Sequence, residues 1–171
     1  MIGDVKLICF YGPESTGKSM MAKKMAAHYQ TEFVPEVAKE IISSNDFTLD
    51  DIIKIAHAQN ARVIEKSKTA NRLLFCDTDL ITTQIYCRHY LKIVPSILYE
   101  LEKEIQYDQY FLFDIDVPWV ADGLRDLGEQ RIEMFHRFKR ALEIRNLRHT
   151  MVSGDWLSRE TLIKNELRKF F

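Results

Sequence analysis

One glycine-framed segment, residues 12–19, constrains the fold more than any other part of this 171-residue chain. Its sequence is Gly12-Pro13-Glu14-Ser15-Thr16-Gly17-Lys18-Ser19, which matches the pattern G-x-x-x-x-G-K-[ST]. The apolar run at 5–11 before it is typical of a strand buried on both faces of a parallel sheet. Residues 19–29 after it are rich in Met, Ala and Lys, which favour a helix. The order of strand, glycine turn and helix predicts one unit of an α/β fold.

The same alternation of strand and helix continues along the chain. Further strands are predicted over 32–34, 73–76, 110–113 and 149–152, and further helices over 36–44, 48–68, 80–91, 96–106, 129–145 and 157–171. Thr48 and Asp51 have the spacing of a capped helix start. Strands that alternate with helices in this way form an open, mostly parallel sheet with helices on both faces. We therefore predict a five-stranded α/β fold, and a chain of this length predicts a single domain, residues 1–171.

The chemistry of the segment at 12–19 is that of a phosphate cradle. Successive N–H groups at a helix start bind phosphate oxygens, and glycines let the backbone approach them. Lys18 adds a positive charge at the β- and γ-phosphates, and Ser19 offers a hydroxyl ligand to Mg²⁺. We expect the run from Gly12 to Met20 to bind ATP with Mg²⁺, as in a P-loop NTPase. The alternative is a glycine turn with an incidental lysine.

Acidic residues follow two of the predicted strands, at the edge of the sheet where ligands bind in open α/β folds. Asp77 and Asp79 come directly after the strand at 73–76. We expect them to hold Mg²⁺, directly or through water, and Asp79 to contact a substrate, whereas the alternative is a helix-capping pair. Glu36 follows the strand at 32–34, and we expect it to accept a proton from an attacking hydroxyl or to bind a sugar. Its alternative is an acidic residue in the first turn of a helix.

Two arginines six residues apart belong to a glycine-containing loop at 115–128 and to the helix after it: Arg125 lies in the loop and Arg131 in the helix. The guanidinium fork matches phosphate oxygens, so we expect both to close over the phosphates while the loop excludes water. Arg131 is alternatively a solvated residue of its helix. Trp119 either stacks on an aromatic base or packs beneath the loop. Gly154, after the last strand, is expected near the adenine.

The composition excludes several classes of protein. The 24 basic and 25 acidic residues give a formal charge of −1, unlike the strongly basic balance of non-specific nucleic-acid binders. Three cysteines without Cys-x-x-Cys spacing indicate neither a disulfide framework nor a zinc site. No apolar run approaches the ~18 residues of a membrane span, and none has the form of a signal peptide. We expect a cytoplasmic protein with a small-molecule substrate and no nucleic-acid or membrane partner. The sequence does not indicate an oligomeric state.

Four segments together resemble one family, the ribosylnicotinamide kinase domain of NadR-type proteins. They are the segment at 12–19, Val34-Pro35-Glu36, Asp77-Thr78-Asp79 and Pro118-Trp119-Val120-Ala121-Asp122-Gly123-Leu124-Arg125. The resemblance spans nearly the whole chain. It implies phosphorylation of the 5′-hydroxyl of nicotinamide riboside by ATP and Mg²⁺, which gives nicotinamide mononucleotide. It also implies that Asp77 serves Mg²⁺, that Glu36 is the base or a sugar ligand, and that Trp119 and Asp122 contact the acceptor nucleoside.

The chain departs from that family at two positions, where Val37 and Lys39 replace a frequent tyrosine and arginine. Longer NadR-type proteins add an adenylyltransferase domain, for which 171 residues leave no room, so the expectation is kinase activity alone. The alternatives are a kinase for another nucleoside and a P-loop nucleotide-binding regulatory ATPase.

Overall fold

The computed structural model describes residues 4–120, 124 and 126–171. Over these residues the chain forms one sheet in the order β2-β3-β1-β4-β5, and every neighbouring pair of strands is parallel. The strands are β1 (Lys6–Tyr11), β2 (Phe33–Val34), β3 (Leu73–Asp77), β4 (Gln109–Phe113) and β5 (His149–Val152). The predicted parallel five-stranded α/β sheet is confirmed.

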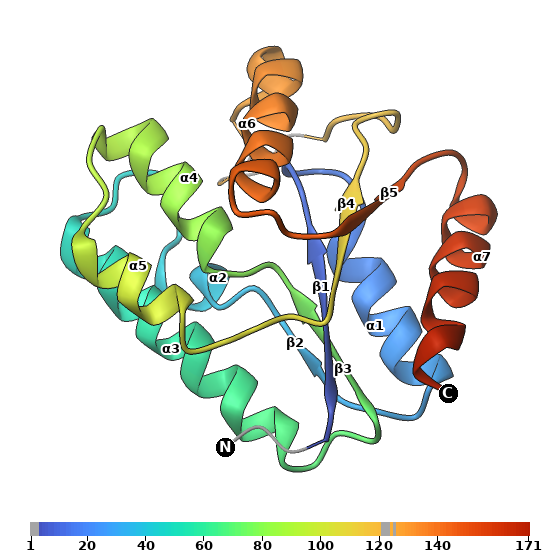
Figure 1. Ribbon diagram of the computed structural model, residues 1–171. Coiled ribbons are helices and arrows are strands. Elements are labelled where there is room, and N and C mark those ends of the chain that lie inside the picture. The colour runs from blue at the N-terminus through green and yellow to red at the C-terminus, as the bar shows by residue number, and fades with distance from the viewer. Residues whose placement is uncertain (1–3, 121–123, 125) are drawn as a thin grey trace.

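Helices cover both faces of this sheet (Figure 1). Among the described residues they are α1 (Lys18–His28), α2 (Ala38–Ile41), α3 (Leu49–Ser67), α4 (Leu80–Leu91), α5 (Ser96–Glu102), α6 (Arg131–Ile144) and α7 (Trp156–Leu167), with short 3-10 turns η1 (Gly128–Gln130) and η2 (Arg168–Phe170). Helices α1 and α7 lie on one face, and α3, α4 and α6 lie on the other. None of the described helices combines the length and apolarity needed to cross a membrane.

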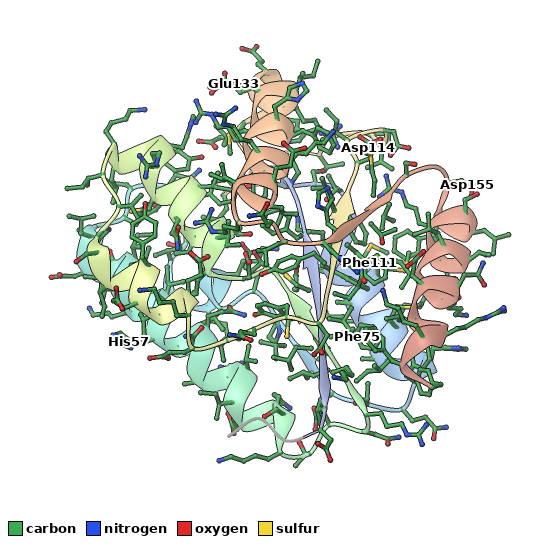
Figure 2. All side chains as sticks on the ribbon, viewed as in Figure 1. His57, Phe75, Phe111, Asp114, Glu133 and Asp155 are labelled. Atoms are coloured by element: carbon green, nitrogen blue, oxygen red, sulfur yellow. The ribbon has the colours of Figure 1, made fainter. Side chains whose placement is uncertain are left out.

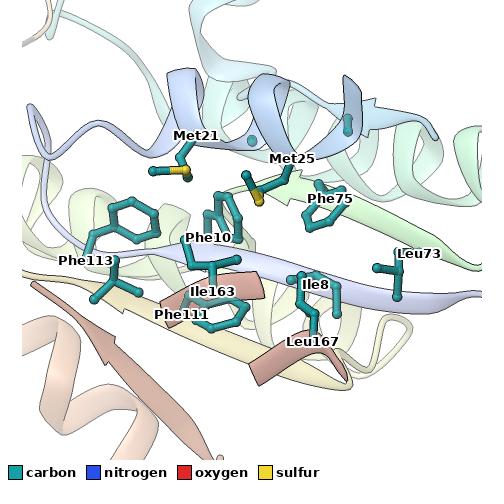
Figure 3. Packing of buried hydrophobic residues seen from close by; sticks show 13 residues of the cluster. Ile8, Phe10, Met21, Met25, Leu73, Phe75, Phe111, Phe113, Ile163 and Leu167 are labelled. Carbon is teal, nitrogen blue, oxygen red and sulfur yellow. The ribbon is translucent and has the colours of Figure 1, made fainter. Parts of the chain in front are cut away.

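The central strand, β1, is buried on both faces because its side chains alternate between two cores. Ile8 and Phe10 point to the core beneath α1 and α7, which Figure 3 shows from close by. Cys9 and Tyr11 point to the opposite core, where the Tyr11 hydroxyl donates a 2.9 Å hydrogen bond to the backbone carbonyl of Phe138 in α6. A continuous apolar run is what a central parallel strand requires. This strand therefore fixes where the segment at 12–19 emerges.

The start of α3 follows the predicted cap. The Thr48 Oγ1 accepts a hydrogen bond of 3.2 Å from the Asp51 N–H, and an Asp51 carboxylate oxygen accepts one of 2.9 Å from the Thr48 N–H. This reciprocal pair satisfies two N–H groups that a helix start otherwise leaves without partners.

Two helices are shorter than predicted. The helix expected over 36–44 is reduced to α2, because Ile42 takes an extended conformation with φ −118° and ψ 143°. The polar residues that follow, at 43–46, are poor helix formers. The helix expected over 96–106 ends at Glu102, because the chain must then turn back to enter β4.

Candidate functional site

The segment at 12–19 follows the carboxyl end of β1. Its backbone conformation favours glycine at two positions, Gly12 and Gly17. Gly12 has a φ of +135°, and a Cβ there would lie 2.9 Å from the backbone oxygen of Phe113. Gly17 has a φ of +87° and faces the indole of Trp156, whose nearest ring carbon would lie 3.2 Å from a Cβ. Both positions combine a left-handed backbone with a close neighbour. The two glycines of the motif are thus required by the shape of the loop.

The carbonyl oxygens of this loop are bound by side chains around it. The Thr16 hydroxyl and the Lys18 ammonium donate to the Pro13 oxygen over 2.9 and 2.6 Å. The Arg131 guanidinium donates to the Ser15 oxygen over 3.1 Å. A loop whose carbonyls are held in this way leaves its N–H groups to an anion. These contacts are compatible with the predicted phosphate cradle, which stays a prediction.

A buried arginine that we did not single out from the sequence, Arg159, braces this loop from below. It is 1% exposed. Its guanidinium donates over 2.9 Å to the Thr16 oxygen, over 2.9 Å to the Gly154 oxygen and over 3.3 Å to the Asp114 oxygen, and it pairs with the Asp116 carboxylate. Figure 2 labels Asp114, where β4 ends, and Asp155, where α7 begins. Arg159 thus connects the segment after β4 with the segment before α7.

The spacing of residues in α7 could have indicated from the sequence that Arg159 is buried. It lies four and eight residues before Ile163 and Leu167, which are the other buried residues of that helix. A charged residue on the buried face of a helix needs partners, because an unpaired buried charge is costly. The position therefore points to a set of acceptors beneath the loop.

Replacing Arg159 with methionine is expected to lower the free energy of unfolding by about 2–4 kcal/mol, because buried acceptors lose their donor. The affinity for ATP should fall with it, since the Thr16 carbonyl is released. Urea denaturation and calorimetric titration with ATP measure the two effects. Arg140→Met, at an exposed position of α6, is the matched control and should change neither quantity. Equal stability of the two variants would contradict the bracing role.

The structure brings Ser19 and Asp77 together. The Ser19 hydroxyl donates to one oxygen of the Asp77 carboxylate. The other oxygen, Oδ1, is buried and has no protein partner among the described residues. Burial, and then the nearby Glu36 carboxylate, raise the pKa of Asp77, while Lys18 opposes the shift. A hydroxyl beside a carboxylate oxygen that lacks a partner is a donor set that fits Mg²⁺.

Asp79 takes a different place from Asp77. Its carboxylate accepts a hydrogen bond of 3.0 Å from the Thr82 N–H at the start of α4 and one of 2.9 Å from the Tyr110 hydroxyl. Burial raises the pKa of Asp79 to about 6. Its side chain is 2% exposed and is not among the described residues that line the cavity beside the loop. The helix-capping alternative describes Asp79, and the expected contact with a substrate is not supported by its position.

A cavity of about 440 Å³ joins the loop to a chamber between α2, α3 and α4. Its polar end contains Lys18, Ser19, Glu36 and Asp77. Its far end is apolar and aromatic, and the residues there include Phe47, Ile52, Ile55, Tyr86 and Tyr90. The Glu36 carboxylate lies 3.1 Å from the Lys39 ammonium. The cavity thus combines a charged end, which includes Glu36, with an apolar and aromatic end suited to a flat ring.

The loop after β4 is tied to the phosphate loop at several points. The Val120 N–H donates to the Ser15 hydroxyl over 2.8 Å, and the Leu127 N–H donates to the Glu14 carboxylate over 2.8 Å. Burial raises the pKa of Glu14. These bonds place the loop over the cavity, which Val117, Pro118, Val120 and Leu124 help to line.

The same loop also meets the connection between α2 and α3. The Asn45 side-chain amide donates to the Leu124 oxygen over 3.1 Å, and the Tyr90 hydroxyl of α4 bonds to Asp126. Neither Asn45 nor the two tyrosines of α4 were identified from the sequence. The wall of the chamber is therefore formed by segments far apart in the chain.

Four other predicted site residues stand outside the cavity or outside the described residues. Arg131 donates to the Val117 and Ser15 oxygens, so it braces the two loops and its expected contact with phosphates is not supported. Trp119 packs on Gly128, where a Cβ would lie 2.8 Å from the indole, which matches the packing alternative. Asp122 and Arg125 lie outside the described residues.

Gly154 keeps a place near the loop without reaching the cavity. Its N–H donates to the Asp116 carboxylate over 2.5 Å, and its carbonyl accepts from Arg159. It is not among the described lining residues, so its expected closeness to adenine stays a prediction.

The comparison with known families and proteins places the chain. A model of the family described as AAA domain matches residues 7–159. The chain belongs to the AAA domain family. This AAA domain is 31% identical over 159 residues to the trifunctional NAD biosynthesis/regulator protein NadR of Escherichia coli (strain K12), a match that covers 88% of the chain and 39% of that relative. The chain therefore spans about two fifths of the length of this curated relative.

Solved structures share the fold of this AAA domain. A NadR protein in complex with NR matches with a TM-score of 0.83 at 18% identity, over 97% of this chain and 50% of that one. A deoxyadenosine kinase from M. mycoides matches with a TM-score of 0.69 at 14% identity, over 95% of this chain and 99% of that one. The fold is thus the one shared by P-loop nucleoside kinases, as predicted, and the relationship to NadR predicted from the sequence is confirmed.

Proposed function

We propose that this AAA domain transfers the γ-phosphoryl group of ATP to the 5′-hydroxyl of nicotinamide riboside, with nicotinamide mononucleotide and ADP as products. The observation that carries the proposal is the cavity that joins the phosphate loop to an apolar, aromatic chamber, with Glu36 in its wall. The relationship to NadR supports the same acceptor, because a NadR protein of the same fold was solved in complex with NR.

The phosphate end of the cavity provides binding and charge. The N–H groups of the loop and the Lys18 ammonium bind the β- and γ-phosphates. Ser19 and Asp77 would hold Mg²⁺, which supplies positive charge to the phosphate oxygens when it is bound. The Ser19 hydroxyl, which donates to the Asp77 carboxylate in this structure, would offer its oxygen to the metal.

The acceptor end orients the hydroxyl. The Glu36 carboxylate accepts the proton of the 5′-hydroxyl as its oxygen forms the bond to the γ-phosphorus. The bond from that phosphorus to the bridging oxygen breaks, and ADP leaves with the electron pair. The described residues of the loop after β4 that line the cavity, Val117, Pro118, Val120 and Leu124, would help to exclude water, which would otherwise receive the phosphoryl group.

Incubation of the purified protein with ATP, Mg²⁺ and nicotinamide riboside tests the proposal. We expect equal amounts of nicotinamide mononucleotide and ADP, and loss of both when EDTA removes the metal. Deoxyadenosine, thymidine and adenosine in the same assay serve as competing acceptors. Bound ATP without nicotinamide mononucleotide would overturn the acceptor, and ADP formed at the same rate without any acceptor would favour a regulatory ATPase.

A further inference from the structure

One buried donor in the acceptor chamber has no partner. Gln59 of α3 is 2% exposed and lines the cavity. Its side-chain oxygen accepts a hydrogen bond of 3.0 Å from the Val37 N–H. Its side-chain nitrogen, Nε2, is buried and has no hydrogen-bond partner among the described residues. Buried amide donors are nearly always paired, so this one calls for an explanation.

The orientation of the Gln59 amide is fixed by its neighbour. If the amide turned over, its NH₂ group would face the Val37 N–H, and two donors would meet. The NH₂ group must therefore point away from Val37. Because Gln59 lines the cavity, a ligand in the chamber is the available partner.

The surroundings of Gln59 indicate which part of a ligand it meets. Ile52 and Ile55 lie seven and four residues earlier on the same face of α3, and both line the chamber with apolar groups. Among the α3 residues that line the cavity, Gln59 is the one with a polar side chain, so a flat ring packed on this face of α3 would meet its amide. The ribose, in contrast, must reach toward Glu36 and the phosphate loop.

Three of the five buried side-chain polar atoms that lack partners in the described part of the chain belong to residues of this cavity. Asp77 Oδ1 and Thr78 Oγ1 follow β3 at the phosphate end, and Gln59 Nε2 belongs to α3. Unpaired groups gathered in one cavity are typical of a binding site that a ligand completes. Of these three unpaired groups, the Gln59 amide is the one that α3 contributes to the acceptor chamber.

We propose that Gln59 donates a hydrogen bond to a carbonyl oxygen on the ring of the acceptor and so selects acceptors that carry such an oxygen. The proposal rests on the proposed function, and it adds the group that distinguishes one acceptor ring from another. For nicotinamide riboside the oxygen is that of the carboxamide. The NH₂ group of that carboxamide is not required.

Three ribosides test this on the unaltered protein. They are nicotinamide riboside, 3-acetylpyridinium riboside, which keeps only the carbonyl, and pyridinium riboside, which has no substituent. We expect the first two to have similar kcat/KM and the third to be lower by about tenfold, because it leaves the Gln59 donor unpaired. Equal kcat/KM for all three would overturn the proposal.

Two variants assign the preference to Gln59. Gln59→Glu keeps an oxygen for the Val37 N–H but replaces the NH₂ group, and Gln59→Met keeps the size and removes both. In either variant kcat/KM for nicotinamide riboside should fall about tenfold, while pyridinium riboside changes less than twofold. His57→Ala, on the outer side of α3 in Figure 2, is the matched control and should keep the preference.

The outcomes separate the inference from the function beneath it. An equal fall for nicotinamide riboside and pyridinium riboside would show that Gln59 acts only through Val37 and would overturn the inference while the kinase stands. If the unaltered protein binds ATP but phosphorylates none of the three ribosides, the proposed function is wrong and the role of Gln59 falls with it. If only Gln59→Glu folds, it carries the comparison alone.

Discussion

Replacing Lys18 with alanine is expected to lower kcat/KM for ATP by about 10²–10³-fold, the usual effect of removing one group that stabilises charge in a transition state. The Lys18 ammonium lies at the polar end of the cavity with Ser19 and Asp77 and reaches the Pro13 oxygen over 2.6 Å. The variant therefore loses both the charge that faces the phosphates and a bond that shapes the loop. Steady-state kinetics with saturating acceptor measure the effect.

The matched control for this change is Lys23→Ala. Lys23 belongs to the same helix, α1, and is exposed away from the cavity. It should leave kcat/KM unchanged, which separates the position of Lys18 from the general charge of the helix. A fall of less than threefold in Lys18→Ala would contradict the assignment of the loop to ATP.

Replacing Glu36 with glutamine is expected to lower kcat by about 10²–10⁴-fold, the range for the loss of a general base. Glutamine keeps the size of the side chain but cannot accept the proton of the acceptor hydroxyl. The KM for ATP should change little, because Glu36 follows β2 and is not part of the loop at 12–19 that we propose binds ATP. Rapid quench of a single turnover separates this loss in the chemical step from slow product release.

Glu40→Gln provides the comparison for Glu36→Gln. Glu40 lies in α2, four residues further on, and pairs with Arg62 at the surface over 3.0 Å. A surface ion pair contributes about 0–1 kcal/mol, so both kcat and the free energy of unfolding should stay near those of the unaltered protein. A kcat for Glu36→Gln equal to that of Glu40→Gln would exclude Glu36 as the base.

The parts of the fold and the site that could be predicted from the sequence are those whose chemistry is local. The loop at 12–19 carries its own glycines, cation and hydroxyl, and an apolar strand and a helix flank it in the chain. Asp77 and Ser19 meet because β3 lies beside β1 in the sheet, so that both follow from the order of strands and loop. Parallel strands bring their carboxyl ends to one edge, which is why the acidic residues could be placed there.

The roles of two neighbouring acids could not be separated in the same way. The positions of Asp77 and Asp79 just after the predicted strand suit a metal ligand and a helix cap equally well. The Asp79 carboxylate accepts hydrogen bonds from the Thr82 N–H at the start of α4 and from the hydroxyl of Tyr110, a residue 31 positions away. No local pattern contains that tyrosine, so the choice depended on tertiary structure.

The contacts that shape the chamber are also long-range. Asn45 and Leu124 are 79 positions apart, and Arg159 and Thr16 are 143 apart. The Gln59 amide gains its orientation from the Val37 N–H, which lies at the start of α2, where a helix leaves its N–H groups to partners from elsewhere in the chain. The sequence predicted a longer helix at 36–44, but α2 ends where Ile42 becomes extended, before the polar residues at 43–46.

The two tryptophans of the chain flank the phosphate loop, and this has a practical consequence for optical work. Trp156 rests on Gly17, and Trp119 packs on Gly128 in the segment whose next residue, Val120, is bonded to Ser15. Tryptophan emission therefore comes from the two sides of one loop, whereas the cores contribute only through tyrosines such as Tyr11 and Tyr110. Fluorescence excited selectively through tryptophan is a local probe of this loop, and far-ultraviolet circular dichroism is needed beside it to follow global unfolding.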